Sequence, residues 1–176
     1  MRYKVISFYS EPDRLSRYYT DHSKRFISEC KKYDIDYHVE ELKGEGDYYK
    51  NCRMKPGFIQ DCMNIFKMPL LWLDIDTYIK RRPNLDSLSN TNFAAVKNPA
   101  KNYPIFAHCL FFNDTQNSLK LLKDWKISCD GVNGKHIGDH SILCKILKDK
   151  NIDYEFIDDF TKYTVAPVKE VKSKRK

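Results

Sequence analysis

Hydrophobic and polar residues follow two distinct periods along the chain, and these periods predict an α/β order of elements. Residues 3–9 are mostly apolar, a pattern that is typical of a strand. Residues 10–13 (Ser-Glu-Pro-Asp) then carry the capping and proline signals of a helix start, and apolar residues recur at helical spacing to about Tyr33. Alternation from Ile35 to Val39 predicts a second strand. A β-α-β opening predicts a right-handed crossover and a parallel pair of strands.

The middle of the chain predicts a buried strand that ends in two acids. Residues 42–51 are predicted to be a loop, and Pro56 marks the first turn of a helix. Residues 70–73 are apolar at every position, which is typical of a strand buried on both faces of a sheet. Asp74 and Asp76 follow at once and should project together, because residues two apart in an extended chain share a face.

The second half of the chain has a more mixed pattern. Strands are expected at 78–80, 93–96, 108–112 and 152–156, and helices are expected from the cap at 113–115 and from 138–140. The whole pattern predicts one α/β domain over 1–165, with a mixed, mainly parallel sheet flanked by helices. Ligands of such a sheet bind at the carboxyl ends of its strands.

Charge is unevenly distributed. The formal net charge is +7, but residues 169–176 hold five basic residues and one acid, so the rest of the chain carries only +3. We expect residues 166–176 to be a basic, flexible tail that either binds polyanions or only aids solubility. The tail and the twelve tyrosines also permit a non-catalytic nucleic-acid-binding protein.

Cysteine usage and the apolar runs bear on location. Six cysteines are scattered without a CxxC pair, which favours free buried thiols over a zinc cluster. The N-terminus is strand-like from its start and has no signal-peptide pattern, and no apolar run is long enough to span a membrane. We therefore expect a cytoplasmic protein, in the host cytoplasm if it is viral.

The two acids after the central strand are the main candidates for chemistry. Asp74 and Asp76 offer hard oxygen ligands, which suit Mg²⁺ or Mn²⁺, and such an ion commonly carries substrate phosphates. The alternative is that the two acids simply end the strand in a solvated turn.

Four segments, in this order, resemble the GT-A class of nucleotide-sugar glycosyltransferases. They are the strand 5–10, the basic segment and helix start 48–59, the apolar strand ending in Asp-x-Asp at 71–76, and the strand 108–113 followed by a helix and Gly-Asp-His at 138–140. The resemblance implies a Rossmann-like GT-A domain that transfers a sugar, in the first place from a UDP-sugar, to a hydroxyl acceptor. A glycan, a protein or a hydroxylated DNA base would qualify as acceptor, in a compact viral or bacterial enzyme without a membrane span.

The resemblance also implies roles for residues that bind the donor and a metal. Asp76 would bind Mn²⁺ or Mg²⁺, which stabilises the leaving diphosphate as a Lewis acid. Asp74 would contact the donor or reach the same metal. Arg53 and Lys55 would meet phosphate or sugar oxygens near a helix start, although an ordinary solvated basic pair has the same pattern.

Two further groups of residues follow from the same comparison. Phe8, Tyr9 and Ser10 would contact the nucleotide, with core packing as the alternative for Phe8. Asp139 would be a general base or would orient the sugar, and a plain helix cap is its alternative. His140 would be a general base or a metal ligand, or else an ordinary helix histidine.

The sequence departs from the class in two places. His140 stands where the class prefers Gln, and no histidine after it can supply the late metal ligand that many members have. Either Asp74 and Asp76 hold the metal together with phosphate and water, or His136 or His140 replaces that ligand. A phosphohydrolase of the haloacid-dehalogenase type is a rival, because it also has Asp-x-Asp after an apolar strand, and Asp158 and Asp159 resemble its later acidic pair. However, that family places the motif on its first strand and a Thr or Val where Tyr78 stands.

Overall fold

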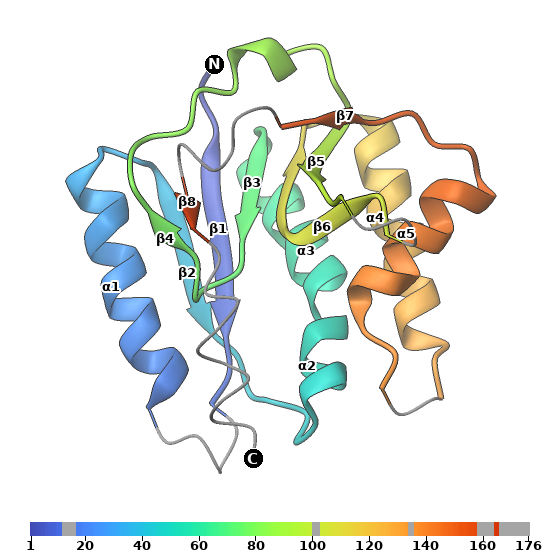
Figure 1. Cartoon of the computed structure of the whole chain (residues 1–176), viewed down its shortest axis with the longest axis horizontal. Helices are drawn as coiled ribbons and strands as arrows, with labels where there is room; N and C mark the ends of the chain where they lie inside the picture. Colours follow the sequence, from blue (N-terminus) through green and yellow to red (C-terminus); the bar gives the residue numbers. More distant parts are fainter. Residues whose placement is uncertain (12–16, 100–102, 134–135, 158–163, 166–176) are drawn as a thin grey trace.

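A computed structural model of the chain describes residues 1–11, 17–99, 103–133, 136–157 and 164–165 (Figure 1). The predicted helix start at 10–13, the acids Asp158 and Asp159 and the basic tail fall wholly or partly outside these ranges. The elements are β1 (Lys4–Tyr9), α1 (Tyr18–Lys32), β2 (Tyr37–Glu41), α2 (Tyr48–Arg53), α3 (Lys55–Phe66), β3 (Leu70–Leu73), β4 (Tyr78–Ile79), the 3₁₀ turn η1 (Asp86–Leu88), β5 (Phe93–Lys97), β6 (Ile105–Phe112), α4 (Gln116–Asp130), α5 (Asp139–Asp149), β7 (Glu155–Phe156) and β8 (Thr164–Val165).

The sheet is mixed and mainly parallel, as the sequence predicts. Its six strands are ordered β2-β1-β3-β6-β5-β7. Strand β1 pairs in parallel with both β2 and β3, β7 is parallel to β5, and β6 is antiparallel to β3 and β5. The parallel pairs at β1 place the carboxyl ends of β1 and β3 at the same edge of the sheet, which is where Asp74 and Asp76 follow.

Helices cover both faces of the sheet. Helix α1 lies on one side, and α3, α4 and α5 lie on the other (Figure 1). Along β3 the side chains alternate between the two resulting cores, with Trp72 in the core under α3 and α4 and Leu73 in the core under α1. All four residues of β3 are buried, so this strand is the centre of the fold.

Helix starts explain much of the agreement with the sequence. Thr115 caps α4 by accepting a hydrogen bond from the Ser118 backbone N–H, as its cap signal predicts. Pro56 lies in the first turn of α3. Gly138 is the residue before α5, and Asp139 is its first helical residue.

The predicted loop at 42–51 is wrong over its second half, where α2 begins at Tyr48. The Asp47 side chain accepts a hydrogen bond from the Lys50 backbone N–H and starts this short helix. Gly44 and Gly46 dominate the local sequence pattern, and the six residues of α2 are too few to show a helical period.

Strand β6 contains an irregular segment that matters for the site. Ala95 pairs with Leu110, yet its neighbour Val96 pairs with Phe106, so residues 107–109 bulge out of the ladder with β5. Bulges of this kind re-aim backbone and side chains and are common beside active sites. Here the bulge frees the Ala107 carbonyl for a side chain of another element.

The cysteines are as the sequence predicts, whereas one short strand was not predicted. All six cysteines are free, and every one except the half-buried Cys52 is buried, as predicted. Strand β8 was not predicted; it pairs antiparallel with β4, which directly follows the two acids. Within the described ranges, no helix has the length and apolar character to cross a membrane.

Candidate active site

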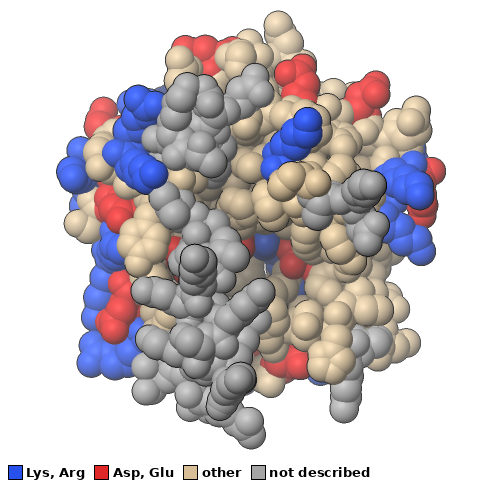
Figure 2. Space-filling model, viewed as in Figure 1, with Lys and Arg blue, Asp and Glu red and all other residues tan. Residues whose placement is uncertain are grey.

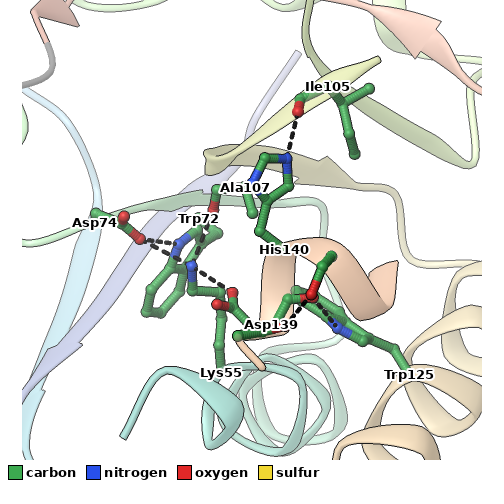
Figure 3. Close-up of polar contacts among 10 residues, drawn as sticks. Lys55, Trp72, Asp74, Ile105, Ala107, Trp125, Asp139 and His140 are labelled. Carbon is green, nitrogen blue, oxygen red and sulfur yellow. Dashed lines mark hydrogen bonds and ion pairs between the residues drawn. The ribbon is translucent and has the colours of Figure 1, made fainter. Parts of the chain in front are cut away.

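A buried lysine is the centre of the candidate site. Lys55, the first residue of α3, is only 5% exposed. Its Nζ lies 3.0 Å from Asp74 Oδ1 and 2.8 Å from Asp139 Oδ2, and it donates a hydrogen bond of 3.0 Å to the Ala107 carbonyl (Figure 3). We call these four groups the Lys55 cluster. It joins residues from α3, the end of β3, the β6 bulge and the start of α5.

The charges in the Lys55 cluster support one another. Burial disfavours the ammonium group, but the Asp139 and Asp74 carboxylates outweigh burial and hold the pKa of Lys55 above its usual value. The lysine therefore stays charged. The Trp72 ring adds a cation–π contact, with its centroid 5.1 Å from Lys55 Nζ.

Asp74 is held from several sides but remains open to a ligand. Trp72 Nε1 donates a hydrogen bond of 2.9 Å to Asp74 Oδ1. The Asp74 backbone N–H donates to the His108 carbonyl, and the Asp74 carbonyl accepts from the Thr77 backbone N–H, both at 2.9 Å. The side chain is still 37% exposed, so one side of this oriented carboxylate can meet a substrate.

Asp139 is positioned mainly through its backbone. Trp125 Nε1 of α4 donates a hydrogen bond of 3.0 Å to the Asp139 carbonyl. Its carboxylate is 7% exposed and makes no cap hydrogen bond, so the simple cap interpretation is wrong. The contact of Asp139 Oδ2 with Lys55 is an ion pair by distance and lacks the geometry of a regular hydrogen bond. Asp139 therefore keeps acceptor capacity toward the interior of the site.

Asp76 has a different electrostatic environment. Burial and the neighbouring Asp74 carboxylate raise the pKa of Asp76 from 3.8 to about 7. Lys55 and Arg25 of α1 lower it by less than these two effects raise it. The Arg25 guanidinium stacks on the Tyr78 ring, 3.6 Å from its centroid. Near neutral pH the folded chain thus keeps a carboxyl group whose charge is incompletely matched.

The two acids fit a divalent cation in part. A cation beside Asp74 and Asp76 would relieve the repulsion that raises the pKa of Asp76. Among the described residues, no three His, Cys, Asp or Glu side chains converge on one point. The residues therefore suit Mg²⁺ or Mn²⁺ held by one or two carboxylates, with further oxygens from substrate phosphates and water.

His140 points away from the Lys55 cluster. Its Nε2 lies 2.6 Å from the Ile105 carbonyl, to which it donates, and its ring packs on Tyr103 with centroids 5.0 Å apart (Figure 3). Although His140 directly follows Asp139, successive residues of a helix point about 100° apart. The structure therefore gives this imidazole a backbone partner on β6.

The three residues predicted to contact the nucleotide lie at the end of β1. Phe8 is 9% exposed and packs against Phe58 and Trp72, with ring centroids 5.3 and 5.4 Å away, as its core alternative predicts. The Tyr9 hydroxyl donates to Glu41 of β2. Ser10 is buried beneath Gly44, where an added Cβ would lie 3.4 Å from Ser10 Oγ.

Arg53 has a different partner from Lys55, although both were predicted to meet the donor. Arg53 Nη1 donates a hydrogen bond of 2.7 Å to the Ile137 carbonyl, in the segment just before α5. It therefore ties the end of α2 to the start of α5. The solvated-pair interpretation is wrong for Lys55, which is buried and paired.

Sequence reasoning missed three contributors to the site. Trp72 was read only as an apolar strand residue, and its indole N–H gave no signal of its role. His108 drew attention only as part of a strand, yet burial lowers its pKa, and the charges of Asp74 and Lys55 also act on it. Cys52 lies near the same carboxylates, and burial together with Asp139 raises its pKa to about 12. The spacing of Tyr48, Cys52 and Lys55 by four and three residues would have placed them on one helical face.

The surface is hollowed where these elements meet. Figure 2 shows a depression near the centre of this face, with basic and acidic atoms at its floor. A hollow lined by both charge signs suits a polar ligand that carries both hydroxyls and anionic groups.

Comparison with solved structures identifies the fold. The chain matches a glycosyltransferase involved in the glycosylation of the major capsid of PBCV-1, with a TM-score of 0.70 and 14% identity over 99% of this chain and 98% of that one. It also matches the glycosyltransferase GlyE of Streptococcus pneumoniae TIGR4, with a TM-score of 0.55 and 13% identity over 91% of this chain, which spans 46% of GlyE. The chain thus has a glycosyltransferase fold.

Sequence comparison adds no relative: no protein-family model and no curated protein matches the chain. The fold match lends no support to the phosphohydrolase alternative. Asp74 follows the third strand of the chain rather than the first, and Lys55 and Trp72 already engage its Oδ1.

Proposed function

We propose that this chain is a metal-dependent glycosyltransferase that moves a sugar from a nucleoside-diphosphate sugar to a hydroxyl acceptor. The observation that carries the proposal is the Lys55 cluster beside Asp76, at the carboxyl end of the central strand of a glycosyltransferase fold. It combines oriented hydroxyl acceptors with a pair of acids that suits a cation. Ligands of α/β sheets bind at this edge.

The donor sugar is the natural ligand of the Lys55 cluster. Asp74 and Asp139 offer carboxylate oxygens that accept hydrogen bonds from sugar hydroxyls. Lys55 pairs with both carboxylates and holds them in place. Because these groups are fixed before the donor binds, the sugar is oriented without a large loss of conformational freedom at the moment of reaction.

The diphosphate then belongs beside Asp76. Mn²⁺ or Mg²⁺ bound there would neutralise the negative charge that grows on the leaving diphosphate. Asp76 is the main protein ligand in this proposal, and Asp74 faces the same region from two residues away. A UDP-sugar is the first donor to test.

The chemical step forms one bond and breaks one. The acceptor hydroxyl oxygen bonds to the anomeric carbon, and the bond from that carbon to the diphosphate oxygen breaks, with its electron pair leaving on the nucleoside diphosphate. The hydroxyl proton passes to an oxygen of the departing diphosphate. Asp139 is buried and paired with Lys55, so it serves better to orient the sugar than to accept this proton.

A thermal-shift panel of nucleoside diphosphates, each with and without Mn²⁺, tests the proposal first. A ligand that binds only the folded chain raises its melting temperature by mass action. We expect one nucleotide to give a shift that needs Mn²⁺, and the Asp76→Asn variant to lose it. Asp61→Asn, which removes an exposed carboxylate of α3, is the matched control and should keep it.

Turnover of the selected nucleotide sugar is the second measurement. The expected result is release of the nucleoside diphosphate that Asp76→Asn and metal chelation abolish. Full turnover in chelator, or in Asp76→Asn, would contradict the metal-dependent mechanism. Release of inorganic phosphate from p-nitrophenyl phosphate, without any response to nucleotides, would favour the phosphohydrolase instead.

A further inference from the structure

Beside the Lys55 cluster lies a group of partly exposed side chains that the proposed donor site does not use. Tyr48 and Tyr49 begin α2, and His136 and Ile137 end the segment before α5. We call these four residues the tyrosine rim. Tyr48 is 47% exposed and Ile137 is 41% exposed, so both side chains can meet a ligand.

The tyrosine rim is built as a connected structure. The rings of Tyr48 and Tyr49 meet edge to face at 5.3 Å, and Tyr49 meets His136 in the same way at 5.3 Å. Arg53 ties the rim together from below by donating a hydrogen bond of 2.7 Å to the Ile137 carbonyl. His136 has a φ of 72°, a left-handed conformation that is costly for a residue other than glycine.

The rim adjoins the Lys55 cluster at two points. Tyr48 is hydrogen-bonded to the Cys52 thiol, and the charges of Asp139 and Lys55 act on the pKa of Cys52. Tyr49 packs on Gly138, the residue immediately before Asp139, where an added Cβ would lie 3.6 Å from the tyrosine ring. A molecule that rests on the rim is thus adjacent to the start of α5, whose first residue is Asp139.

We propose that the tyrosine rim is the acceptor subsite and that the acceptor group it binds is a saccharide. This inference rests on the proposed function. A sugar ring has an apolar face of C–H groups that packs against aromatic rings, and tyrosine adds a hydroxyl that can bond to sugar oxygens. Tyrosine also provides contact area with little conformational entropy to lose.

The size and charge of the rim favour a saccharide over a macromolecular surface. Four side chains match one or two sugar rings, whereas a stable protein interface takes roughly 20–30 residues a side. Nucleic acid would require several basic side chains along the rim to neutralise phosphates. Within the described ranges, Arg53 is a cationic side chain that hydrogen-bonds to a rim residue, and its guanidinium already holds the Ile137 carbonyl.

Direct binding tests the subsite without depending on transfer. The chain is labelled with ¹³C-tyrosine and titrated with the methyl glycosides of glucose, galactose, mannose, rhamnose and N-acetylglucosamine, with and without the nucleotide found in the thermal-shift panel. We expect at least one glycoside to shift the signals of Tyr48 and Tyr49. In Tyr48→Ala, the Tyr49 signal should report an affinity weakened by about tenfold.

Two variants control for general effects on the surface. Phe156→Ala removes a similarly exposed aromatic ring from β7, at the far edge of the sheet, and should leave glycoside affinity unchanged. Ile137→Glu places a charge on the rim while keeping the backbone carbonyl that Arg53 binds, and it should weaken affinity as Tyr48→Ala does. Equal affinities in Tyr48→Ala, Phe156→Ala and the parent chain would overturn the proposal.

The remaining outcomes separate this inference from the proposed function. If no glycoside shifts either tyrosine, or if a single-stranded oligonucleotide does so instead, the saccharide subsite is wrong, whatever the donor assays show. If glycosides bind the rim but no nucleotide sugar turns over, the proposed function and the acceptor role fail, and saccharide binding by the rim stands. If both hold, Tyr48→Ala should raise the KM for the glycoside about tenfold, and Phe156→Ala should leave that KM unchanged.

Discussion

The two acids that follow β3 are separated by one residue, yet they lie in opposite electrostatic situations. Asp74 is matched within the protein, because Lys55 Nζ and Trp72 Nε1 both reach its Oδ1. Asp76 is matched poorly, and burial together with Asp74 raises its pKa to about 7. The fold therefore supplies cationic and hydrogen-bonding partners to the Asp74 carboxylate, whereas the environment of Asp76 disfavours its charged form.

This difference separates folding from function in the candidate site. A buried ion pair gives a fixed geometry but is costly to break. A buried carboxylate with a raised pKa costs stability in the free protein and gains it back when a cation arrives. In the proposed function, the Lys55 cluster is thus the preformed part of the site, and Asp76 is the part whose charge a bound cation would neutralise.

Removal of Lys55 should give the largest effect. In Lys55→Met, the buried carboxylate of Asp139 loses its partner, so we expect the free energy of unfolding to fall by about 3–5 kcal/mol. Turnover of the donor should be lost as well. Urea unfolding followed by circular dichroism measures the first effect.

A surface pair provides the control for this experiment. Lys126 pairs with Asp130 at 2.6 Å and is 46% exposed, so Lys126→Met should cost less than about 1 kcal/mol. Adding Asp139→Asn to Lys55→Met should recover part of the loss, because the unpaired charge is then gone. If Lys55→Met unfolds as readily as Lys126→Met, the Lys55 cluster is not closed in solution.

Neutralising Asp76 should raise the free energy of unfolding, whereas removing Lys55 lowers it, and the change should be smaller. Between pH 3.8 and about 7 the folded chain keeps a proton on Asp76 that the unfolded chain releases. Its contribution to stability therefore falls as pH rises through this window and is constant above it. Asp76→Asn should remove this slope and make the metal-free chain more stable at pH 8 by about 1–3 kcal/mol.

Unfolding of Asp76→Asn and the parent chain at pH 4 and pH 8 measures this effect. The free energies of unfolding of the two proteins should be similar at pH 4 and should differ at pH 8. Asp61→Asn should shift stability by no more than about 0.5 kcal/mol at either pH. If the free energy of unfolding has the same pH dependence in the parent chain and in Asp76→Asn, ionisation of Asp76 costs the folded chain no stability. The contrast between Asp76 and Asp74 would then disappear.

Replacement of His140 should have the smallest effect on stability and turnover. It tests whether this residue, which directly follows Asp139, takes part in the reaction. In His140→Gln the side-chain amide can still donate to the Ile105 carbonyl, so stability should change by no more than about 1 kcal/mol. Donor turnover should stay within a few-fold of the parent chain. A fall of about 10²–10⁴-fold, with an altered pH profile, would instead identify the imidazole as a general acid or base.

The order of elements could be predicted well because it depends on local patterns. The apolar run at Leu70–Leu73, the cap at Thr115 and the proline in the first turn of α3 act within a few residues. Helix α2 could not be predicted, because six residues carry too little periodicity to outweigh the glycines before them. Strand β8 could not be predicted either, because two residues form a strand only through their pairing with β4.

The residue types of the site could be predicted, but their partners could not. Asp74, Asp139 and Lys55 all stood out in the sequence, each with a different expected role. Their convergence depends on three long-range contacts that no local pattern encodes. Likewise, His140 was indistinguishable from Asp139 until the start of α5 fixed which way each side chain points.

The sequence by itself therefore determined the α/β class, the central buried strand and the two acids that follow it, because hydrophobic period and turn signals are local properties. Tertiary structure alone decided that Lys55 is buried between Asp74 and Asp139, that the β6 bulge offers the Ala107 carbonyl, and that burial and Asp74 raise the pKa of Asp76. The reason is physical: the energy of a charge depends on burial and on distances to other charges, and both are set only when distant segments pack together.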